Sequence, residues 1–218
     1  MILPALWIAV CAAAPSVESV LKRMASLAIP DTADYRAVTT VHTGTITTTV
    51  SMHVIQAGRN LRRMEIDAGG RRSVLVTNGG RSSATDLVTG KSVALPALPQ
   101  TEDPTDAVKR YMASRWESPV ARGDGRWEMR QLVDGDSSVV FRSILWDDVS
   151  GELLSLEQIG KRGDSTRIAF EWIRVDGRVV PALINMEHSA SAGTIQAETA
   201  FSGWLFPRSI PSFLFTIR

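Results

Sequence analysis

The chain has 218 residues, of which 44% are hydrophobic and 22% are charged, and its formal net charge is +1. This length and composition are typical of one folded domain with a sizeable core, and they exclude a disordered tail. The nearly neutral charge also excludes a strongly basic nucleic-acid-binding domain.

The first segment, residues 2–14, is an uncharged apolar run that ends in small side chains. It is too short to span a bilayer as a helix, and Ala12–Ala14 resembles the Ala-x-Ala site of a secretory signal. No Lys or Arg precedes the run, and Pro15 would follow the cut, which are two departures from a standard signal. We expect residues 1–14 to be the signal peptide of an exported, periplasmic protein, and residues 15–218 to form a single domain.

Cys11 is the only cysteine, so the chain cannot form an intramolecular disulfide. It lies in the sequence IAVC, which resembles the acylation signal of bacterial lipoproteins. Val10 stands where that signal has a small residue, so we favour a cleaved signal over a membrane anchor at Cys11.

The segment PSVESVLKRMASL, residues 15–27, has apolar side chains at helical spacing, with Glu18, Lys22 and Arg23 off that face. It predicts an amphipathic N-terminal helix. A strand-like region follows, in which residues 45–54 alternate strictly between apolar or β-branched side chains and polar ones. Gly-containing turn sequences recur at short intervals up to Gly90, and they predict sequential antiparallel hairpins.

The proline-rich residues 96–106 interrupt this pattern, and a stretch with helical spacing follows. We expect a short inserted helix there that carries Tyr111, Met112 and Trp116. Strand patterns resume near Gly125 and continue through the rest of the chain. The sequence therefore predicts an α+β, mainly β fold with one curved antiparallel sheet of about eleven strands, covered by the N-terminal and inserted helices.

Asp147, Asp148 and Glu152 lie within six positions and could hold a metal or act in acid/base chemistry. They also flank Gly151 between two apolar runs, which is typical of a hairpin turn. No His is near them in sequence, so we favour the turn. The tripeptide at Arg162–Asp164, RGD, is likewise interpreted as a turn.

The three histidines are His42, His53 and His188. A two-His metal site is conceivable for the first two, but both share strand faces with Thr and Ser, so we expect no metal. Neither a Gly-x-Ser-x-Gly elbow nor a Gly-rich phosphate loop is present. We expect no enzymatic activity and no cofactor, although a hydrolase with one of these histidines near a Ser and an acid stays open.

Residues 56–81 contain six Arg against two acidic residues. This excess fits either a surface that meets anionic headgroups or an acidic partner, or solvated hairpins with Arg at strand edges. We favour the solvated hairpins.

The order of these segments resembles the LolA-like superfamily, which includes periplasmic lipoprotein carriers, the amino-terminal domain of RseB/MucB regulators and LppX/LprG-type lipid carriers. The resemblance lies in turn-and-strand phrases and covers most of the chain after residue 15. These phrases are SVESVLKRMASL, ADYRAVTTVHTG, NLRRMEIDAGGRRSVLVTNGGRSSATDLVTGKSVALP, ILWDDVSGELLSLEQIGKRGD, FEWIRVDGRVVPALINME and IPSFLFTIR.

The resemblance implies a half-open β-barrel whose concave face shelters acyl chains beneath helices. The residue that would latch such a cover is not identified. The candidate lining residues are apolar positions of the predicted strands and the first helix: Leu21, Met24, Val50, Met52, Met64, Phe141, Phe170, Trp172 and Met186. Ordinary core packing is an alternative role for each of them. Tyr111, Met112 and Trp116 are the candidate cover.

We therefore expect a monomeric, exported carrier for the acyl chains of lipoproteins or lipids, with a membrane donor or acceptor protein as a further partner and no nucleic acid. The alternative is an RseB-type envelope sensor that binds a protein partner through the same fold. The chain shows no second domain, which speaks against a complete regulator of that type.

Overall fold

The computed structural model describes residues 14–27, 30–58, 60–96, 114–132 and 139–217. Within these residues it contains one α-helix, fourteen strands and one short 3-10 helix. The helices are α1 (Val17–Ser26) and η1 (Ser212–Phe215), and the strands are β1 (Thr32–Thr43), β2 (Ile46–Ala57), β3 (Leu61–Ala68), β4 (Arg71–Asn78), β5 (Arg81–Asp86), β6 (Ser92–Leu95), β7 (Arg115–Trp116), β8 (Val120–Gly123), β9 (Arg126–Leu132), β10 (Val139–Asp147), β11 (Glu152–Gly160), β12 (Ser165–Val175), β13 (Arg178–Ala190) and β14 (Gly193–Leu205).

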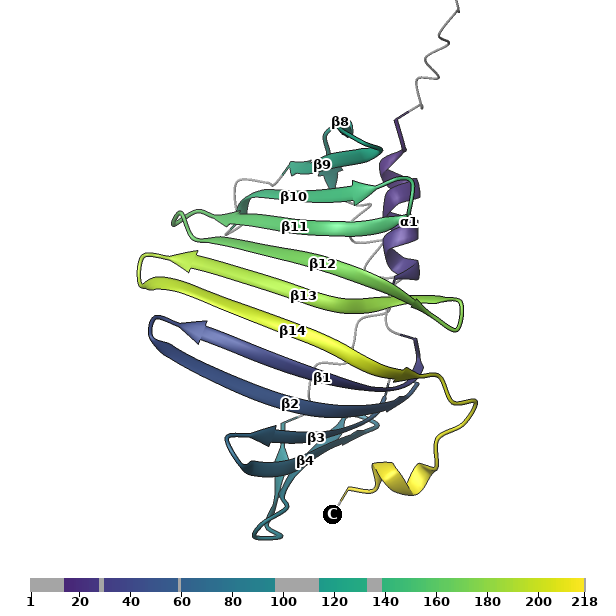
Figure 1. The fold of residues 1–218 in the computed structure, drawn as a ribbon, viewed down its shortest axis with the longest axis vertical. Helices are drawn as coiled ribbons and strands as arrows, with labels where there is room; N and C mark the ends of the chain where they lie inside the picture. The colour runs from purple at the N-terminus through teal and green to yellow at the C-terminus, as the bar shows by residue number, and fades with distance from the viewer. Residues whose placement is uncertain (1–13, 28–29, 59, 97–113, 133–138, 218) are drawn as a thin grey trace, which may run out of the picture.

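All fourteen strands belong to one antiparallel sheet (Figure 1). Strands β1 to β6 follow one another from the middle of the sheet to one end, and β14 back to β9 follow one another to the other end. The two runs meet where β1 pairs with β14, so the first and last strands lie side by side at the centre. Among the described residues the sheet is not closed, since β6 and β7 lie at its two ends.

The predicted architecture is confirmed, with two differences. The sheet has more strands than expected because of β7 and β8, two short strands next to β9. Trp116 belongs to β7 and pairs with Gln131, so the prediction that it lies on an inserted helix is wrong. Its backbone is extended because it hydrogen-bonds along the edge of β9. Tyr111 and Met112 lie outside the described residues.

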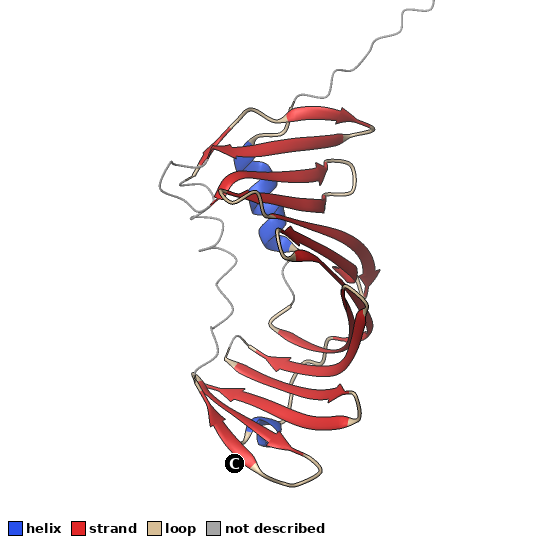
Figure 2. Cartoon of the chain, turned by 90° about the vertical axis from the view of Figure 1, so that its left-hand side faces the viewer, coloured by secondary structure: helices blue, strands red, loops and turns tan. Residues whose placement is uncertain are grey.

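The sheet bends into a half-barrel with a concave and a convex side (Figure 2). We call the concave side the inner face and the convex side the outer face. Because side chains alternate along a strand, the register assigns each residue to one of them. In β1, for example, Tyr35 and Ala37 lie on the inner face, and Asp34 and Arg36 lie on the outer face.

The helix α1 covers the inner face at the β9–β12 end of the sheet. Ser16 caps it, since its Oγ accepts a hydrogen bond from the backbone N–H of Ser19 at 3.1 Å. Val20 and Leu21 are each 1% exposed and pack on Met129, Ile144, Trp146 and Leu153. This dry cluster fixes the helix on the sheet, as the amphipathic pattern predicts.

The opposite end of the sheet is supported from the outer face. Phe215 of η1 is 1% exposed and packs against Val74 and Val76 of β4. The side-chain amide of Asn78 donates a hydrogen bond to the backbone oxygen of Phe215 at 3.0 Å. The carboxy-terminal segment is thus tied to the outer face. No helix in the described part of the chain has the length and apolar character needed to cross a membrane.

Candidate functional site

Apolar side chains cross the inner face in rows that run perpendicular to the strands. One of these rows, which we call the apolar row, pairs residues on six neighbouring strands, from β9 to β14. Its members are Met129, Ile144, Leu156, Ile168, Met186 and Ala197. At one end, Met129 and Ile144 are buried under α1, whereas the row beyond β10 is half-buried. The row therefore continues the dry core into a surface that can accept an apolar ligand.

The middle of the inner face carries several small side chains where β1 pairs with β14. Thr39 of β1 pairs with Thr199 of β14, and on either side of this pair Ala37 lies opposite Phe201 and Ala197 lies opposite Val41. The hydroxyls of Thr39 and Thr199 bond to each other at 3.0 Å, so these polar atoms are satisfied without a ligand. We call these four small residues the floor: Thr39, Ala197 and Thr199 are half-buried, and Ala37 is buried in a cluster against which Met52 and Phe201 pack.

Larger apolar side chains stand on both sides of this floor. Met52 pairs with Ala37 and with Ile66, and Met64 pairs with Val54, on the β2–β3 side. On the other side, Phe170 stacks on Trp172 with ring centroids 5.7 Å apart, and the Trp172 indole N–H donates to the backbone oxygen of Leu153 at 2.7 Å. The resulting shape is a shallow apolar trough with flexible Met side chains in one wall.

An aromatic cluster closes the trough at the ends of β1 and β14. Tyr35 stacks on Trp204 with centroids 4.2 Å apart, and Phe201 lies 6.0 Å from both rings. Burial raises the pKa of the Tyr35 hydroxyl, although the charge of Arg62 opposes this shift. Tyr35 is therefore neutral at ordinary pH, and this wall carries no charge of its own.

Six of the nine predicted lining residues come together on this surface. They are half-buried and lie on the inner face: Val50, Met52, Met64, Phe170, Trp172 and Met186. Leu21 instead lies in the core beneath α1. The side chain of Met24 lies outside the described part of the structure.

Phe141 is placed on the outer face, away from the other candidates. It pairs with Ile159, one position out of phase with the inward-facing Arg142 and Ile144. The guanidinium of Arg130 lies over its ring, 5.6 Å from the centroid. The sequence shows that β10 alternates, but it does not show which of its two faces turns inward.

The carboxylates of the β10–β11 hairpin have structural roles. Asp147 Oδ1 accepts hydrogen bonds from the backbone N–H groups of Val149 and Ser150 at 2.8 and 3.1 Å. Asp148 forms an ion pair with Arg23 of α1 at 3.3 Å. The turn interpretation of this stretch agrees with these contacts. No group of three or more His, Cys, Asp or Glu side chains in the described residues could hold a metal ion.

The three histidines lie on different parts of the sheet. His53 Nε2 is 2.7 Å from Asp34 Oδ1 on the outer face. The rings of His42 and His188 bond to Thr47 and Thr166, at 3.0 and 2.9 Å. Across the described residues, no ring nitrogen of these histidines bonds to a Ser hydroxyl.

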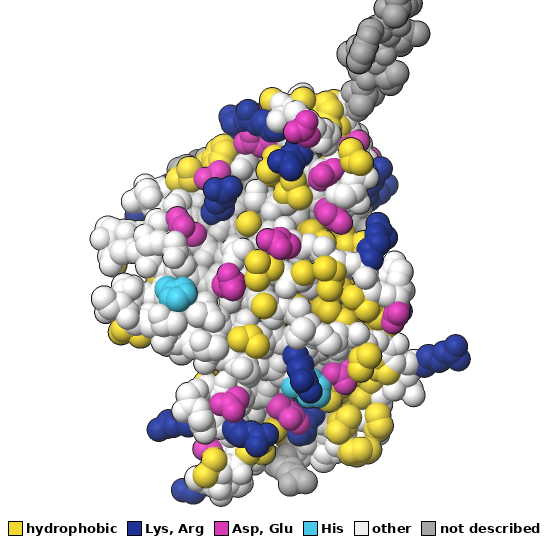
Figure 3. Space-filling model, viewed as in Figure 1, with side chains coloured by type: hydrophobic (Ala, Val, Ile, Leu, Met, Phe, Trp, Pro, Cys, Tyr) yellow, Lys and Arg dark blue, Asp and Glu magenta, His cyan; other side chains and the backbone are white. Residues whose placement is uncertain are grey.

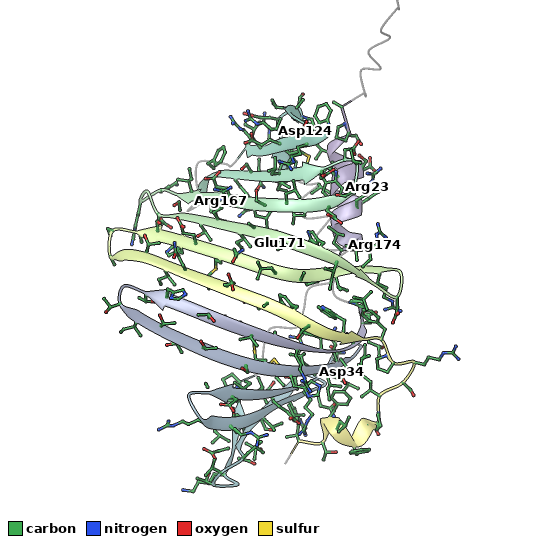
Figure 4. The ribbon with its side chains drawn as sticks, viewed as in Figure 1. Arg23, Asp34, Asp124, Arg167, Glu171 and Arg174 are labelled. Atoms are coloured by element: carbon green, nitrogen blue, oxygen red, sulfur yellow. The ribbon has the colours of Figure 1, made fainter. Side chains whose placement is uncertain are left out.

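The outer face is mixed in character. Figure 3 looks onto this face and shows acidic and basic side chains scattered over the central strands, with apolar groups along one side. Arg167 and Glu171 belong to the outer face of β12, and Asp34 belongs to that of β1 (Figure 4). This alternation of charge distinguishes the outer face from the apolar trough.

No protein-family model matches the sequence, and no curated protein is similar to it in sequence. Solved structures are similar in fold. A LolA superfamily protein from Nitrosomonas europaea superposes with a TM-score of 0.62 at 13% identity, covering 94% of this chain and 99% of that one.

The chain has the LolA-like fold. A domain from Vibrio parahaemolyticus that is named as an outer membrane lipoprotein-sorting protein superposes with a TM-score of 0.57 at 9% identity, covering 91% of this chain and 95% of that one. A DUF1329 family protein from Desulfovibrio piger gives 0.58 at 10% identity, with the same coverage. At these identities the likeness concerns the fold, and the resemblance predicted from turn-and-strand phrases is confirmed at that level.

The sequence interpretation missed the small residues of the floor and the polar residues at one end of the LolA-like half-barrel. Ala37, Thr39, Ala197 and Thr199 have no conspicuous chemistry in sequence, because their importance comes from the pairing of β1 with β14. Arg142 stood in an alternating strand and could have been noticed as a charge in phase with Ile144 and Trp146. Only the packing of those two residues under α1 shows that this phase is the inner one.

Proposed function

We propose that this protein is an exported carrier that shelters the acyl chains of lipids or lipoproteins against the inner face of its half-barrel. The observation that carries the proposal is the apolar trough, which has a floor of small side chains and walls of Met and aromatic residues. The LolA-like fold supports it, since one solved structure of that fold is named as a lipoprotein-sorting domain.

The energetics of such a surface suit binding followed by release. Each buried methylene contributes about 0.8 kcal/mol, so one long acyl chain supplies roughly 10 kcal/mol before the costs of binding. The trough offers apolar contact along its length and few fixed polar contacts. We therefore expect affinity to depend on chain length more than on the identity of the chain.

Binding without catalysis is part of the proposal. The Asp side chain of the β10–β11 turn serves the backbone of that turn, and His42 and His188 bond to Thr hydroxyls, so these groups have structural partners. A hydrolase would turn over an acyl ester, and we expect no turnover here.

The first test is binding of a fluorescent fatty acid to the purified chain, with native mass spectrometry and lipid extraction to detect copurified lipid. We expect each addition of two methylenes to tighten binding about tenfold, until the chain is as long as the trough. A protein that copurifies empty and binds none of the fatty acids would contradict the carrier. Attention would then move to the sensor alternative, tested by capture of a protein partner.

A matched pair of variants on β14 locates the site. Ala197→Trp fills the floor of the trough, whereas Ala200→Trp puts the same bulk on the outer face of the same strand. We expect at least a tenfold loss of fatty-acid affinity for the first variant and none for the second. Equal effects of the two variants would place the binding surface elsewhere.

A further inference from the structure

A row of polar side chains borders the apolar row toward the hairpin ends of the strands. We call it the polar row. Its members pair with one another on five neighbouring strands. Each of them lies two residues along its strand from a member of the apolar row. They are Gln131, Arg142, Gln158, Thr166 and His188. Two residues along a strand span about 7 Å, so the two rows lie within the length of one headgroup and the first carbons of a chain.

Hydrogen bonds hold the polar row in a fixed arrangement. Arg142 Nη1 donates to Gln131 Oε1 at 2.8 Å, and Arg142 Nη2 donates to Gln158 Oε1 at 3.2 Å. Thr166 Oγ1 and His188 Nδ1 are 2.9 Å apart. The half-buried guanidinium is therefore oriented from both sides by neighbouring strands, and its plane is set before any ligand arrives.

The charge of Arg142 is not neutralised by these partners. Both glutamines accept through neutral amide oxygens, and no carboxylate in the described part of the chain pairs with Arg142. Two nearby arginines differ from Arg142 in this respect. Arg122 and Arg130 both bond to the Glu128 carboxylate on the outer face. Arg142 is thus an oriented cation beside the apolar row.

A pocket joins the two rows. It has a volume of about 200 Å³, and its lining combines Arg142, Gln158 and Thr166 of the polar row with Ile144, Leu156 and Ile168 of the apolar row. Glu157 borders the pocket as well, but it is exposed and alternates onto the outer face between Leu156 and Gln158. One side of the pocket thus offers hydrogen-bond donors with a positive charge, and the other offers aliphatic carbon.

We propose that the polar row binds the anionic headgroup of an amphiphile, a carboxylate or a phosphate, while the acyl chain lies along the apolar row. The proposal rests on the proposed carrier function and specifies its ligand class. A guanidinium held by two glutamines can form two parallel hydrogen bonds to an anionic headgroup, which is the geometry that carboxylates and phosphates favour. Thr166 provides a hydroxyl on the next strand but one.

The test compares three probes of equal chain length on the full chain: dodecanoate, dodecyl phosphate and the uncharged dodecanol, measured by displacement of a fluorescent acyl probe. A charge-assisted hydrogen bond discriminates by roughly ten- to a hundredfold. We expect both anions to bind at least tenfold more tightly than dodecanol. We expect Arg142→Gln to remove this difference, and an unchanged urea unfolding midpoint would show that the variant is folded.

Arg167→Gln is the matched control, because it removes an exposed Arg from the outer face of β12. This variant should keep the preference for anions. A preference that survives in Arg142→Gln, or dodecanoate that binds no more tightly than dodecanol to the unaltered protein, would overturn the headgroup site and leave the carrier standing. If none of the three probes binds, both proposals fall.

Inorganic phosphate distinguishes a lipid headgroup from a free anion. We expect millimolar phosphate not to displace dodecyl phosphate, because most of the affinity comes from the chain. If phosphate displaced dodecyl phosphate at a concentration as low as that at which dodecyl phosphate binds, the ligand would not be an amphiphile. The polar row would then be a site for a free anion.

Discussion

Two hairpin tips at opposite ends of the sheet have the same local sequence and the same backbone. Residues 86–90 and 147–151 both follow the pattern Asp-x-Val-Ser/Thr-Gly. Asp86 Oδ1 accepts from the N–H groups of Val88 and Thr89, both at 2.8 Å, as Asp147 Oδ1 does from Val149 and Ser150. Each loop ends in a glycine with positive φ, +69° at Gly90 and +77° at Gly151.

The surroundings of the two tips are different. The β5–β6 tip is attached to β4, where the Leu87 N–H donates to the backbone oxygen of Arg72 at 2.9 Å. At the β10–β11 tip, the Asp148 N–H donates to the backbone oxygen of Gly125 at 2.9 Å, and its carboxylate pairs with Arg23 of α1. Local sequence therefore determines the loop and the role of its first Asp, whereas tertiary contacts determine what the loop holds in place.

The largest difference should appear at the residue that precedes the Asp of each tip. Trp146 is fully buried beneath α1, whereas Thr85 is half-buried and shares a hydroxyl contact with Ser92 at 2.8 Å. We expect Trp146→Ala to lower the free energy of unfolding by about 3–5 kcal/mol, and Thr85→Ala by about 1 kcal/mol or less. Urea denaturation measures both.

Trp146→Phe separates packing from polarity at the same position. The indole nitrogen of Trp146 is buried, and among the described residues it has no hydrogen-bond partner. Phe removes that group and keeps most of the ring, so its cost should stay below about 1.5 kcal/mol. A cost similar to that of the Ala variant would mean that the stability of this end depends on the exact shape of the Trp146 side chain, and not on the burial of an aromatic ring.

The glycines that close the two tips should respond alike. A Cβ at Gly90 or Gly151 would meet no other atom within 4 Å, so only the positive φ opposes a side chain. Gly90→Ala and Gly151→Ala should each cost about 1–2 kcal/mol. Thermal or urea unfolding that separates them by more than about 1 kcal/mol would show that the loops are not equivalent.

Gly125 tests the contact that the second tip makes and the first lacks. A Cβ there would lie 2.7 Å from Val149 Cγ2, and its φ is +76°. Gly125→Ala should therefore cost more than Gly151→Ala, and Val149→Ala in the same chain should recover the excess. Failure of the second change to recover it would locate the strain in the backbone of Gly125.

The hairpin that supports the second tip should give the chain a dependence on pH. Burial tends to raise the pKa of Glu128, but hydrogen bonds from Arg130 and Arg122 outweigh it, so the pKa lies below its ordinary value. A lowered pKa stabilises the fold above the unfolded-state pKa, and this stabilisation is lost as pH falls through the folded-state pKa. Glu128→Gln should cost about 1 kcal/mol at neutral pH and progressively less in acid, as measured by urea unfolding across pH.

The smallest effect should come from the Asp that shapes the first tip. Hydrogen bonds from the backbone of Thr89 and then of Val88 lower the pKa of Asp86 despite its exposure. As for Glu128, the lowered pKa means that the Asp86 carboxylate stabilises the fold above the ordinary pKa of Asp, and that this stabilisation disappears in acid. Asp86→Ala should shift the urea midpoint slightly at neutral pH and not at low pH. A titration of the Asp86 carboxyl followed by NMR that gives an ordinary value would contradict the role of these bonds.

Local patterns predicted much of the fold. The spacing of Val17, Val20 and Leu21 predicted α1, and the Gly-containing turns predicted the hairpins of β2 to β6. The failure at Trp116 has a local cause, because a few apolar residues at helical spacing do not show where a helix would end and where the edge of a sheet begins. The site was predicted in part, since alternation identifies an apolar face without showing which face of β10 is enclosed.

The sequence by itself determined most of the strand segments, where they turn, and that Asp147 belongs to a turn, because these depend on neighbours within a few residues. Only the tertiary structure decided that β1 pairs with β14, and so that Ala37, Thr39, Ala197 and Thr199 form one floor. It also decided that Arg142 faces inward while Phe141 faces outward. These outcomes depend on contacts between residues far apart in the chain, and the bend of the whole sheet selects the face that becomes the trough.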